Sequence, residues 1–163
     1  MRGCGGAGVR GCAGAEVRGC GGAKVRGCGG VNIALAACIM ARDFTELAAW
    51  QLSNELRQLI LSIVARPNVR TDFKYCDQCK DAARSAASNI AEGFGRCRHK
   101  EFAHFLDYSI GSLKELHDLL IDGHSRGYVS DEELTSGVRL SKRAKAACAA
   151  LAAYLRRTPD PRR

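Results

Sequence analysis

The sequence predicts an all-α protein, an antiparallel up-and-down four-helix bundle that follows a disordered, Gly/Cys-rich repeat. In four successive segments between residues 43 and 157, apolar residues recur at spacings of three and four, as along the buried face of a helix. The connections between these segments are short, and no segment alternates apolar and polar residues as a strand does. The same features argue against a long coiled coil, because no heptad pattern continues from one segment to the next.

Residues 1–39 differ in composition from the rest of the chain. They hold most of the eighteen glycines and five of the nine cysteines, and they follow an octapeptide pattern, V-R-G-C-x-G-x-x, four times. At most one valine per unit cannot bury enough apolar surface to offset the entropy of ordering the chain, so we expect disorder. An upstream nucleotide repeat that has become translated is the alternative origin, with Met40 as the natural first residue.

The cysteines of this repeat do not form a metal-binding pattern. Cys4, Cys12, Cys20 and Cys28 are each separated by seven residues, whereas zinc sites use closer pairs such as C-x-x-C. The apolar run at 31–40 is short, and it lacks the compact basic segment that opens a secretory signal. No run is long enough to span a membrane, so we expect a cytoplasmic protein with no membrane contact.

The first predicted helix begins near Asp43 and is closed by Pro67. Its apolar face repeats at intervals of four, three and four, in the residues Leu52, Leu56, Leu59 and Ile63. The second helix begins at Thr71, a candidate N-cap, and ends at Gly93 and Gly95, for which we expect a C-terminal cap with positive φ.

Small residues dominate the second helix. Its predicted inward face consists of Ala83, Ala87, Ile90 and Phe94, and its neighbouring faces carry Ala82, Ser85, Ala86 and Ser88. A helix that is slim on several sides is suited to burial between several partners. We expect Asn89 and Glu92 to hold backbone ends or neighbouring helices in register, and Glu92 to pair with Arg96 one turn later.

The third predicted helix begins near His99 and ends around Gly127. Its apolar stripe consists of Phe102, Phe105, Leu106, Ser109, Leu113, Leu116 and Leu120. The fourth helix begins at a capping box formed by Ser130 and Glu133, and Pro159 stops it. Its apolar stripe consists of Leu134, Val138, Ala144, Cys148, Leu151 and Leu155. The predicted bundle therefore spans residues 40–157, and residues 158–163 form a basic tail.

Catalytic and metal-binding patterns are weak, so we expect no enzyme activity, no cofactor and no metal. The glycines at 93 and 95 lack the following lysine and the preceding strand of a phosphate-binding loop. A single E-x-x-H at 101–104 is insufficient for a di-metal bundle, which needs two such motifs and further glutamates. Cys76 and Cys79 form a lone C-x-x-C, more consistent with small packing residues than with redox chemistry.

Four stretches together carry a resemblance to a known family: DFTELAAWQ (43–51), ARSAASNIAEGFGR (83–96), KEFAHFLDYSIGSLKEL (100–116) and GYVSDEEL (127–134). The sequence resembles the bacterial four-helix bundle proteins encoded in intervening sequences of large-subunit ribosomal RNA genes. It is also similar to the accessory variability proteins of diversity-generating retroelements. The matching signature residues are Ser88, Asn89, Ala91, Glu92, Gly93, Gly111, Ser112 and Leu113.

The resemblance implies a ring-like homopentamer without enzyme activity. It also implies a role in binding nucleic acid, with a reverse transcriptase as protein partner in the retroelement branch. The segment ARPNVRTDFKYC replaces the proline-rich connection common in the family before the second helix, and the 1–39 repeat has no family counterpart.

Positive charge is concentrated near the C-terminus. Residues 40–138 carry a net charge of −3, whereas residues 139–163 hold eight basic residues and one acidic residue. The candidate phosphate-binding residues are Arg139, Lys142, Arg143, Lys145, Arg156 and Arg157 in the fourth helix, and Arg96, Arg98 and Lys100 in the turn after the signature. The alternative interpretation of these cations is a solvated helix face.

Two functions remain open from the sequence. The protein is either an accessory module that binds RNA or DNA through its basic fourth helix, or an oligomeric scaffold that docks a protein such as a reverse transcriptase. Aromatic side chains among the cations would favour the first, and the basic region offers only Tyr154 for stacking.

Overall fold

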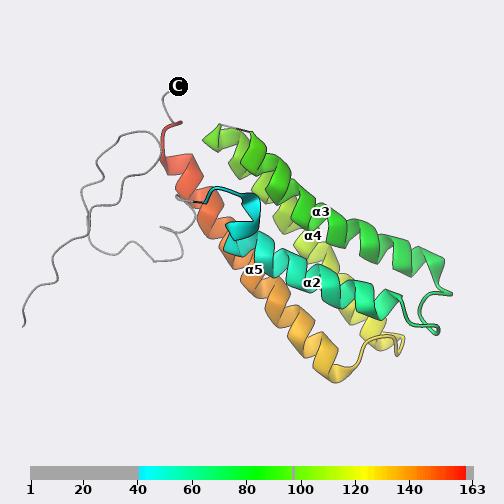
Figure 1. Cartoon of the computed structure of the whole chain (residues 1–163). Coiled ribbons are helices and arrows are strands. Elements are labelled where there is room, and N and C mark those ends of the chain that lie inside the picture. The colour runs from blue at the N-terminus through cyan, green and yellow to red at the C-terminus, as the bar shows by residue number, and fades with distance from the viewer. Residues whose placement is uncertain (1–40, 97, 161–163) are drawn as a thin grey trace, which may run out of the picture.

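The computed structural model describes residues 41–96 and 98–160 of the 163-residue chain. It contains one 3-10 helix, η1 (Phe44–Glu46), and four long helices, α2 (Ala48–Val64), α3 (Phe73–Gly95), α4 (His99–Ser125) and α5 (Asp131–Arg157). Figure 1 shows the four long helices packed side by side. The described residues contain no strand, so the all-α class is confirmed. The 1–39 repeat, with its expected disorder, lies outside the described residues.

The first predicted helix is divided in two. Asp43 accepts a hydrogen bond from the Thr45 backbone amide and begins η1 rather than a long helix. Leu47 is extended (φ −73°, ψ 124°), and α2 begins at the next residue. At the other end α2 stops at Val64, three residues before Pro67, because the residue preceding a proline is disfavoured in helical conformation.

The N-cap of α3 is Asp72 rather than Thr71, so this prediction was wrong by one residue. The Asp72 carboxylate accepts a hydrogen bond from the backbone amide of Tyr75, the geometry that satisfies a free donor in the first turn. Its second oxygen accepts a hydrogen bond from Arg126 (3.0 Å). The cap of α3 is thereby tied to the segment between α4 and α5.

The slim second helix is buried between neighbours, as predicted. Ala83, Ala86 and Ala87 are at most 1% exposed, and α3 packs against both α2 and α4. The Ser109 hydroxyl of α4 donates a hydrogen bond to the backbone carbonyl of Ala86 (2.7 Å). A side chain as short as serine reaches that carbonyl only where two helices approach closely.

The start of α5 has the predicted capping box. Ser130 accepts from the backbone amide of Glu133, and the Glu133 carboxylate accepts from the backbone amide of Ser130. Glu133 also forms an ion pair with Arg66, which follows α2. Just before this cap, Gly127 has φ +74°, the left-handed conformation that glycine adopts without steric cost.

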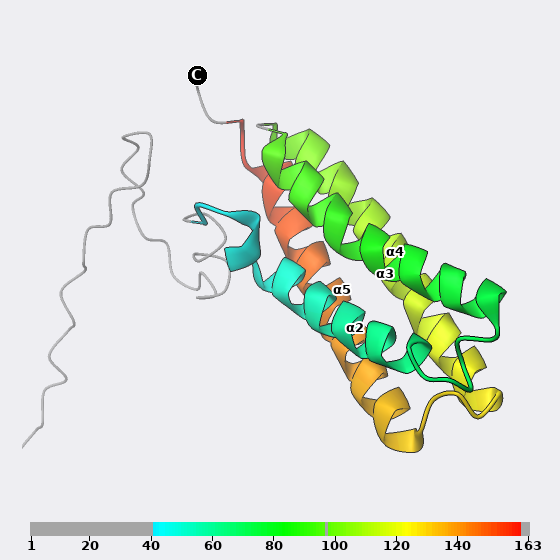
Figure 2. The same ribbon diagram turned by 45° about the vertical axis from the view of Figure 1, so that its right-hand side comes forward.

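Two hydrogen bonds show that α4 runs in the opposite direction to α3 and to α5. The Tyr75 hydroxyl, near the start of α3, donates to the carbonyl of Leu119, near the end of α4 (3.1 Å). The His99 amide, at the start of α4, donates to Asp160, just beyond α5 (2.7 Å). Figure 2 shows the same arrangement, with the end of α5 beside the start of α4.

The core lies along the bundle axis and contains part of each predicted apolar stripe. Its largest fully buried side chains include Leu56, Ile63, Ile90, Leu106, Leu113, Leu116 and Leu120. The stripe members that are only half-buried include Leu52, Leu59, Phe105, Leu134 and Val138. Three serines are also buried, and each donates to a backbone carbonyl: Ser53 to Ala49, Ser109 to Ala86 and Ser141 to Leu113. Of the helices described, none has the length and hydropathy that crossing a membrane requires.

Candidate nucleic-acid interface

The basic residues of α5 form two groups separated along the helix. The first group, which we call the α5 band, consists of Arg139, Lys142, Arg143 and Lys145. Lys145 is half-buried and the other three residues are exposed. The second group, Arg156 and Arg157, lies in the last turn. At 1.5 Å per residue, roughly 17 Å of helix separates the two groups. The basic residues of α5 therefore do not form one continuous surface.

The α5 band influences the neighbouring helix α4. The pKa of His117 is lowered from its ordinary value, chiefly because the imidazole is partly buried and also because Lys145 and Lys142 lie near it. Asp118 acts in the opposite direction, with a smaller effect. The band therefore creates a positive potential that extends across the boundary between α5 and α4.

The cations of the α5 band have no carboxylate partners among the residues that the structure describes. The sequence gives a reason, since no acidic residue occurs between Glu133 and Asp160. A phosphate group that approaches the α5 band would therefore not have to displace a carboxylate from any of these four side chains. This makes the band the strongest candidate for phosphate contact.

A second cationic region forms where α4 begins and α5 ends. His99 is joined to the end of α5 by a hydrogen bond between its Nδ1 atom and the carbonyl of Thr158 (3.1 Å). This contact brings together two groups that are distant in sequence. We call the combined group the end cluster, and its members are Arg96, Arg98, Lys100, Arg156 and Arg157.

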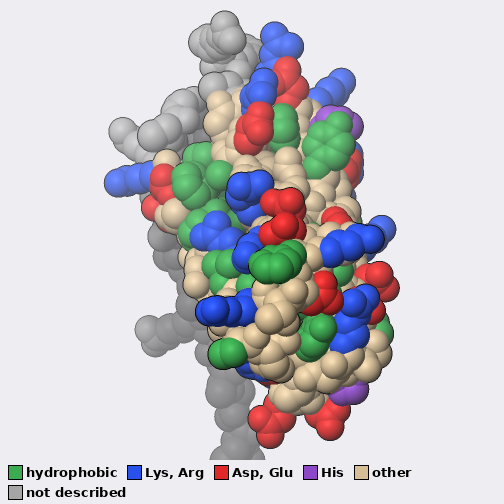
Figure 3. Space-filling view, turned by 90° about the vertical axis from the view of Figure 1, so that its right-hand side faces the viewer, with side chains coloured by type: hydrophobic (Ala, Val, Ile, Leu, Met, Phe, Trp, Pro, Cys, Tyr) green, Lys and Arg blue, Asp and Glu red, His purple; other side chains and the backbone are tan. Residues whose placement is uncertain are grey.

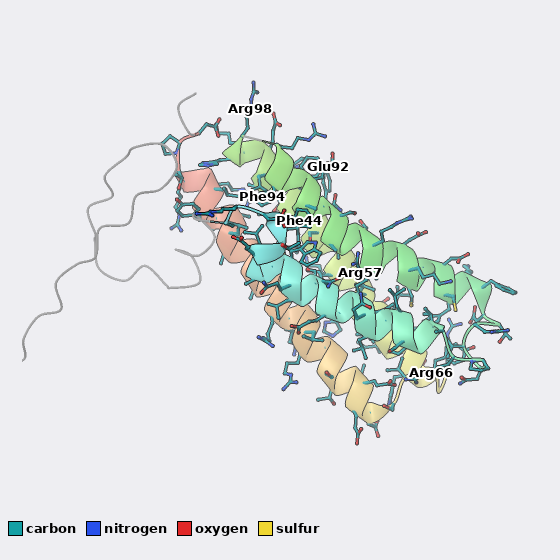
Figure 4. The ribbon with its side chains drawn as sticks, in the orientation of Figure 1. Phe44, Arg57, Arg66, Glu92, Phe94 and Arg98 are labelled. Carbon is teal, nitrogen blue, oxygen red and sulfur yellow. The ribbon has the colours of Figure 1, made fainter. Side chains whose placement is uncertain are left out.

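Most of the charge of the end cluster is already paired. Arg96 pairs with Glu92 at 2.5 Å, as predicted, and Arg98 pairs with Glu101 at 3.5 Å. Arg156 pairs with Asp107 of α4. Figure 4 shows Arg98 and Glu92 at this end of the bundle and Arg66 at the opposite end. Exposed ion pairs are weak, yet each one reduces the positive field that a phosphate would meet.

Other surfaces of the bundle carry mixed or negative charge. On the face shown in Figure 3, Lys and Arg side chains are interleaved with Asp and Glu rather than gathered together. A shallow hollow between α3 and α4 has three carboxylates in its lining, Asp77, Asp81 and Glu115, and one cation, Lys74. An anionic ligand is therefore directed away from the α3–α4 hollow and toward α5.

The polar signature residues of α3 do not hold neighbouring helices in register within one chain. The Asn89 amide donates to the backbone carbonyl of Ser85 (2.8 Å) on its own helix, and Glu92 is exposed and contacts only Arg96 by ion pairing. Ser85 makes the link instead, because the Ser112 hydroxyl of α4 donates to its hydroxyl (2.9 Å). Ser88 is exposed and Ala91 is half-buried.

The expectation that Gly93 and Gly95 cap α3 with positive φ was wrong. Both glycines lie inside α3, and Gly127 alone has positive φ among the glycines described. A Cβ atom at Gly93 would lie 2.5 Å from a ring carbon of Phe102 and 2.8 Å from the Cβ of Phe105. Gly93 is therefore needed for the close approach of α3 to α4.

The signature residues of α4 have three different environments. Leu113 is fully buried in the core, and Ser112 bonds to Ser85 as described above. Gly111 is exposed, and a Cβ atom placed on it would meet nothing within 4 Å. The packing of the chain gives no reason for a glycine at this position.

The cysteines in the described region are packing residues. Cys76, Cys79 and Cys148 are buried and free of disulfides. Burial raises the pKa of Cys79 and of Cys148 to about 11, so both thiols remain protonated at neutral pH. No group of three His, Cys, Asp or Glu side chains within residues 41–96 and 98–160 could hold a metal ion. Cys97 and the five cysteines of the repeat region lie outside the described residues.

Aromatic side chains near the cations are not where the sequence indicated. Tyr154 is half-buried and packs against the core, so it is poorly placed to stack on a base. Tyr108 is 52% exposed and Phe73 is 77% exposed. Both residues lie outside the apolar stripes of their helices, so the spacing of apolar residues could have predicted that both side chains are exposed.

Comparison with known proteins gives one family. A family model described as 23S rRNA-intervening sequence protein matches residues 45–149. The matched region contains the whole α5 band, Arg139 to Lys145, together with the signature residues, and it stops before Arg156. No curated protein matches the chain.

Proposed function

Because this chain belongs to the 23S rRNA-intervening sequence protein family, we propose that it is a non-enzymatic protein that binds RNA through the α5 band. The family name connects the chain with ribosomal RNA, and the α5 band supplies the chemistry that RNA requires. Lysine and arginine side chains that neutralise phosphates release counterions, which is the main source of sequence-independent affinity.

One observation carries this proposal. The four cations of the α5 band lack ion-pair partners among the described residues, whereas Arg96, Arg98 and Arg156 of the end cluster are all paired. Where carboxylates already neutralise a cation, phosphate binding gains less. We therefore assign the main phosphate contacts to the α5 band and a secondary role to the end cluster.

The proposed binding has little sequence preference. The band consists of long side chains on the outside of a bundle, three of them exposed and one half-buried, and reading of base edges requires an element that enters a groove. An assembled homo-oligomer, such as the pentamer that the family resemblance implies, would repeat the α5 band in each subunit. Repetition strengthens binding to a long RNA without any new contact.

A triple variant tests the proposal. Changing Lys142, Arg143 and Lys145 together to Gln keeps helix propensity and removes three positive charges. We expect this variant to bind short RNAs of unrelated sequence more weakly by a similar factor, measured by fluorescence anisotropy at low salt.

The matched control removes three exposed cations elsewhere, by changing Arg70, Lys74 and Lys80 to Gln. Both triple variants lower the net charge by the same amount, so a general charge effect would weaken them equally. Selective weakening of the α5 variant supports the proposal. Equal weakening, or an unmodified protein that does not bind RNA at low salt, contradicts it.

A further inference from the structure

An exposed aromatic pair lies on the outer side of α4. The Tyr108 hydroxyl and the Nε2 atom of His104 are hydrogen-bonded at 2.8 Å, and the two ring centroids are 4.5 Å apart. Tyr108 is 52% exposed and His104 is also exposed. The hydrogen bond restricts the tyrosine ring without covering it, so the ring is oriented before any ligand arrives.

Aromatic and cationic side chains continue from this pair toward α3. The Phe105 and Tyr108 rings are 6.1 Å apart and nearly perpendicular, at 75°. The guanidinium of Arg96 lies 5.2 Å from the centre of the Phe105 ring. One edge of the Tyr108 ring therefore faces Phe105, and Arg96 of the end cluster lies beyond Phe105.

On the other side of Tyr108 the helix surface is bare. Gly111 lies one turn later on the same side of α4, and no atom comes within 4 Å of where its Cβ would be. A glycine in the middle of a helix is unfavourable, and nothing in the packing requires one here. A ligand that approaches the backbone at Gly111 would explain why a residue without a side chain occupies this position.

The bare surface lies at the same level along the bundle as the α5 band. The Ser141 hydroxyl of α5 donates to the carbonyl of Leu113 (2.9 Å), and Ser109 contacts Cys148 (3.8 Å). The segment of α4 between these contacts contains Gly111, and the facing segment of α5 contains Lys142 and Lys145. Because Ser109 and Leu113 are buried and Gly111 is exposed, Gly111 lies on the outer side of α4, and an RNA strand would pass around α4 at Gly111 to connect the band with Tyr108.

We propose that Tyr108, oriented by His104, is a stacking platform for an unpaired base of single-stranded RNA whose phosphates lie on the α5 band. Aromatic side chains beside a basic surface bind single strands because every unpaired base offers a face for stacking. Bases in a duplex are not available in this way. The proposal rests on the function proposed above and specifies its ligand class.

A base fits this surface better than an apolar protein partner does. The apolar neighbour of Tyr108 is Phe105, which is half-buried, and its other neighbours on the outer side of α4 are His104, Asp107 and Gly111. The guanidinium of Arg96 lies beyond Phe105 on the α3 side. An apolar protein partner would need a contiguous exposed apolar patch.

The experiment compares single-stranded and duplex RNA of the same length in the full chain. Tyr108→Ala should weaken single-strand binding between about fivefold and a hundredfold, the range that one stacked base contributes, and should leave duplex binding unchanged. Tyr108→Phe keeps the ring and should retain most of the affinity. Gly111→Gln should also weaken single-strand binding without lowering the thermal midpoint, because the added side chain meets no protein atom.

Phe73→Ala is the matched control. Phe73 is the most exposed aromatic described, and it lies at the opposite end of the bundle, where α3 begins. This variant should bind both RNAs like the unmodified protein. An equal effect of Phe73→Ala and Tyr108→Ala on single strands would overturn the assignment of stacking to Tyr108.

Three further outcomes overturn the proposal. Tyr108→Ala could bind single strands normally, it could weaken single strands and duplex equally, or it could change the oligomeric state measured by light scattering, which would identify a protein interface. A failure of the function proposed above would give a different result. The unmodified protein would then bind neither single-stranded nor duplex RNA, and a substitution at position 108 would change nothing.

Discussion

Two identical substitutions in α4 are expected to change stability in opposite directions. Gly111 and Gly123 both lie within α4. A Cβ atom at Gly111 would meet nothing within 4 Å, whereas one at Gly123 would lie 2.0 Å from the hydroxyl oxygen of Tyr75 and 2.9 Å from a methyl carbon of Val129. Replacing each glycine by alanine therefore separates helix propensity from packing.

The magnitudes follow from these contacts. Gly111→Ala should stabilise the fold by about 0.5–1 kcal/mol, because alanine is the better helix former. Gly123→Ala gains the same amount, but overfilling a packed site costs about 1–3 kcal/mol. It also displaces the buried hydroxyl of Tyr75 from the carbonyl of Leu119, and breaking such a hydrogen bond costs about 1–3 kcal/mol. The net effect is a loss of roughly 1–5.5 kcal/mol.

Thermal and urea unfolding, followed by circular dichroism, measure both variants against the unmodified protein. The free energy of unfolding should rise for Gly111→Ala and fall for Gly123→Ala. A stability loss for Gly111→Ala would show that the surface around Gly111 is covered, for example by a second subunit. An unchanged Gly123→Ala would refute the close packing of Tyr75 on α4.

Three further predictions use the titrating groups. Phosphate bound on the α5 band should raise the lowered pKa of His117, so RNA affinity should increase as the pH falls through and below the ordinary value of 6.5, and His117→Gln should reduce this pH dependence in anisotropy titrations. Arg66 lowers the pKa of Glu133, so this pair should add stability that is lost as the pH falls below the ordinary value of 4.5. Glu133→Gln keeps the capping box, and it should flatten the acid side of a plot of unfolding free energy against pH. Cys79 and Cys148, buried and with raised pKa, should resist alkylation at pH 8 in the native protein and react in denaturant, as measured by peptide mass spectrometry. A persistent pH dependence in His117→Gln, an unchanged acid limb in Glu133→Gln or rapid native alkylation would contradict the respective prediction.

The helices could be predicted from sequence because their apolar periodicity reflects one buried face each. The Leu56, Leu113 and Leu151 positions were predicted as core from spacing alone, and all three are buried. The capping box at Ser130 was predicted for the same kind of reason, since it depends on residues only three apart.

The errors concern contacts between distant residues. Gly93 resembles a helix stop in the sequence, and its role becomes clear only from the position of Phe102 on the next helix. Thr71 and Asp72 are both good N-caps, and the bond from Arg126 to Asp72 is a tertiary contact that favours the second.

The candidate interface was predicted in part. The cations of α5 were identified by charge alone. The α5 band has no carboxylate partners among the residues described, whereas three of the five cations of the end cluster are paired, and this difference depends on how α4 and α5 align. Arg156 meets Asp107, which is 49 residues away in the chain. No sequence pattern indicates that this arginine is neutralised, whereas the absence of acidic residues between Glu133 and Asp160 does favour free cations in the α5 band.

The salt dependence of RNA binding tests the central claim most directly. For single-stranded RNA, each phosphate contact contributes about −0.7 to the slope of log affinity against log salt concentration. Changing Lys142, Arg143 and Lys145 to Gln should therefore reduce the steepness by about 2, which corresponds to a loss of about a hundredfold at 0.1 M salt if the proteins bind equally at 1 M. The control with Arg70, Lys74 and Lys80 changed to Gln should keep the slope of the unmodified protein. Equal slopes for all three proteins would contradict the assignment of phosphate contacts to the α5 band.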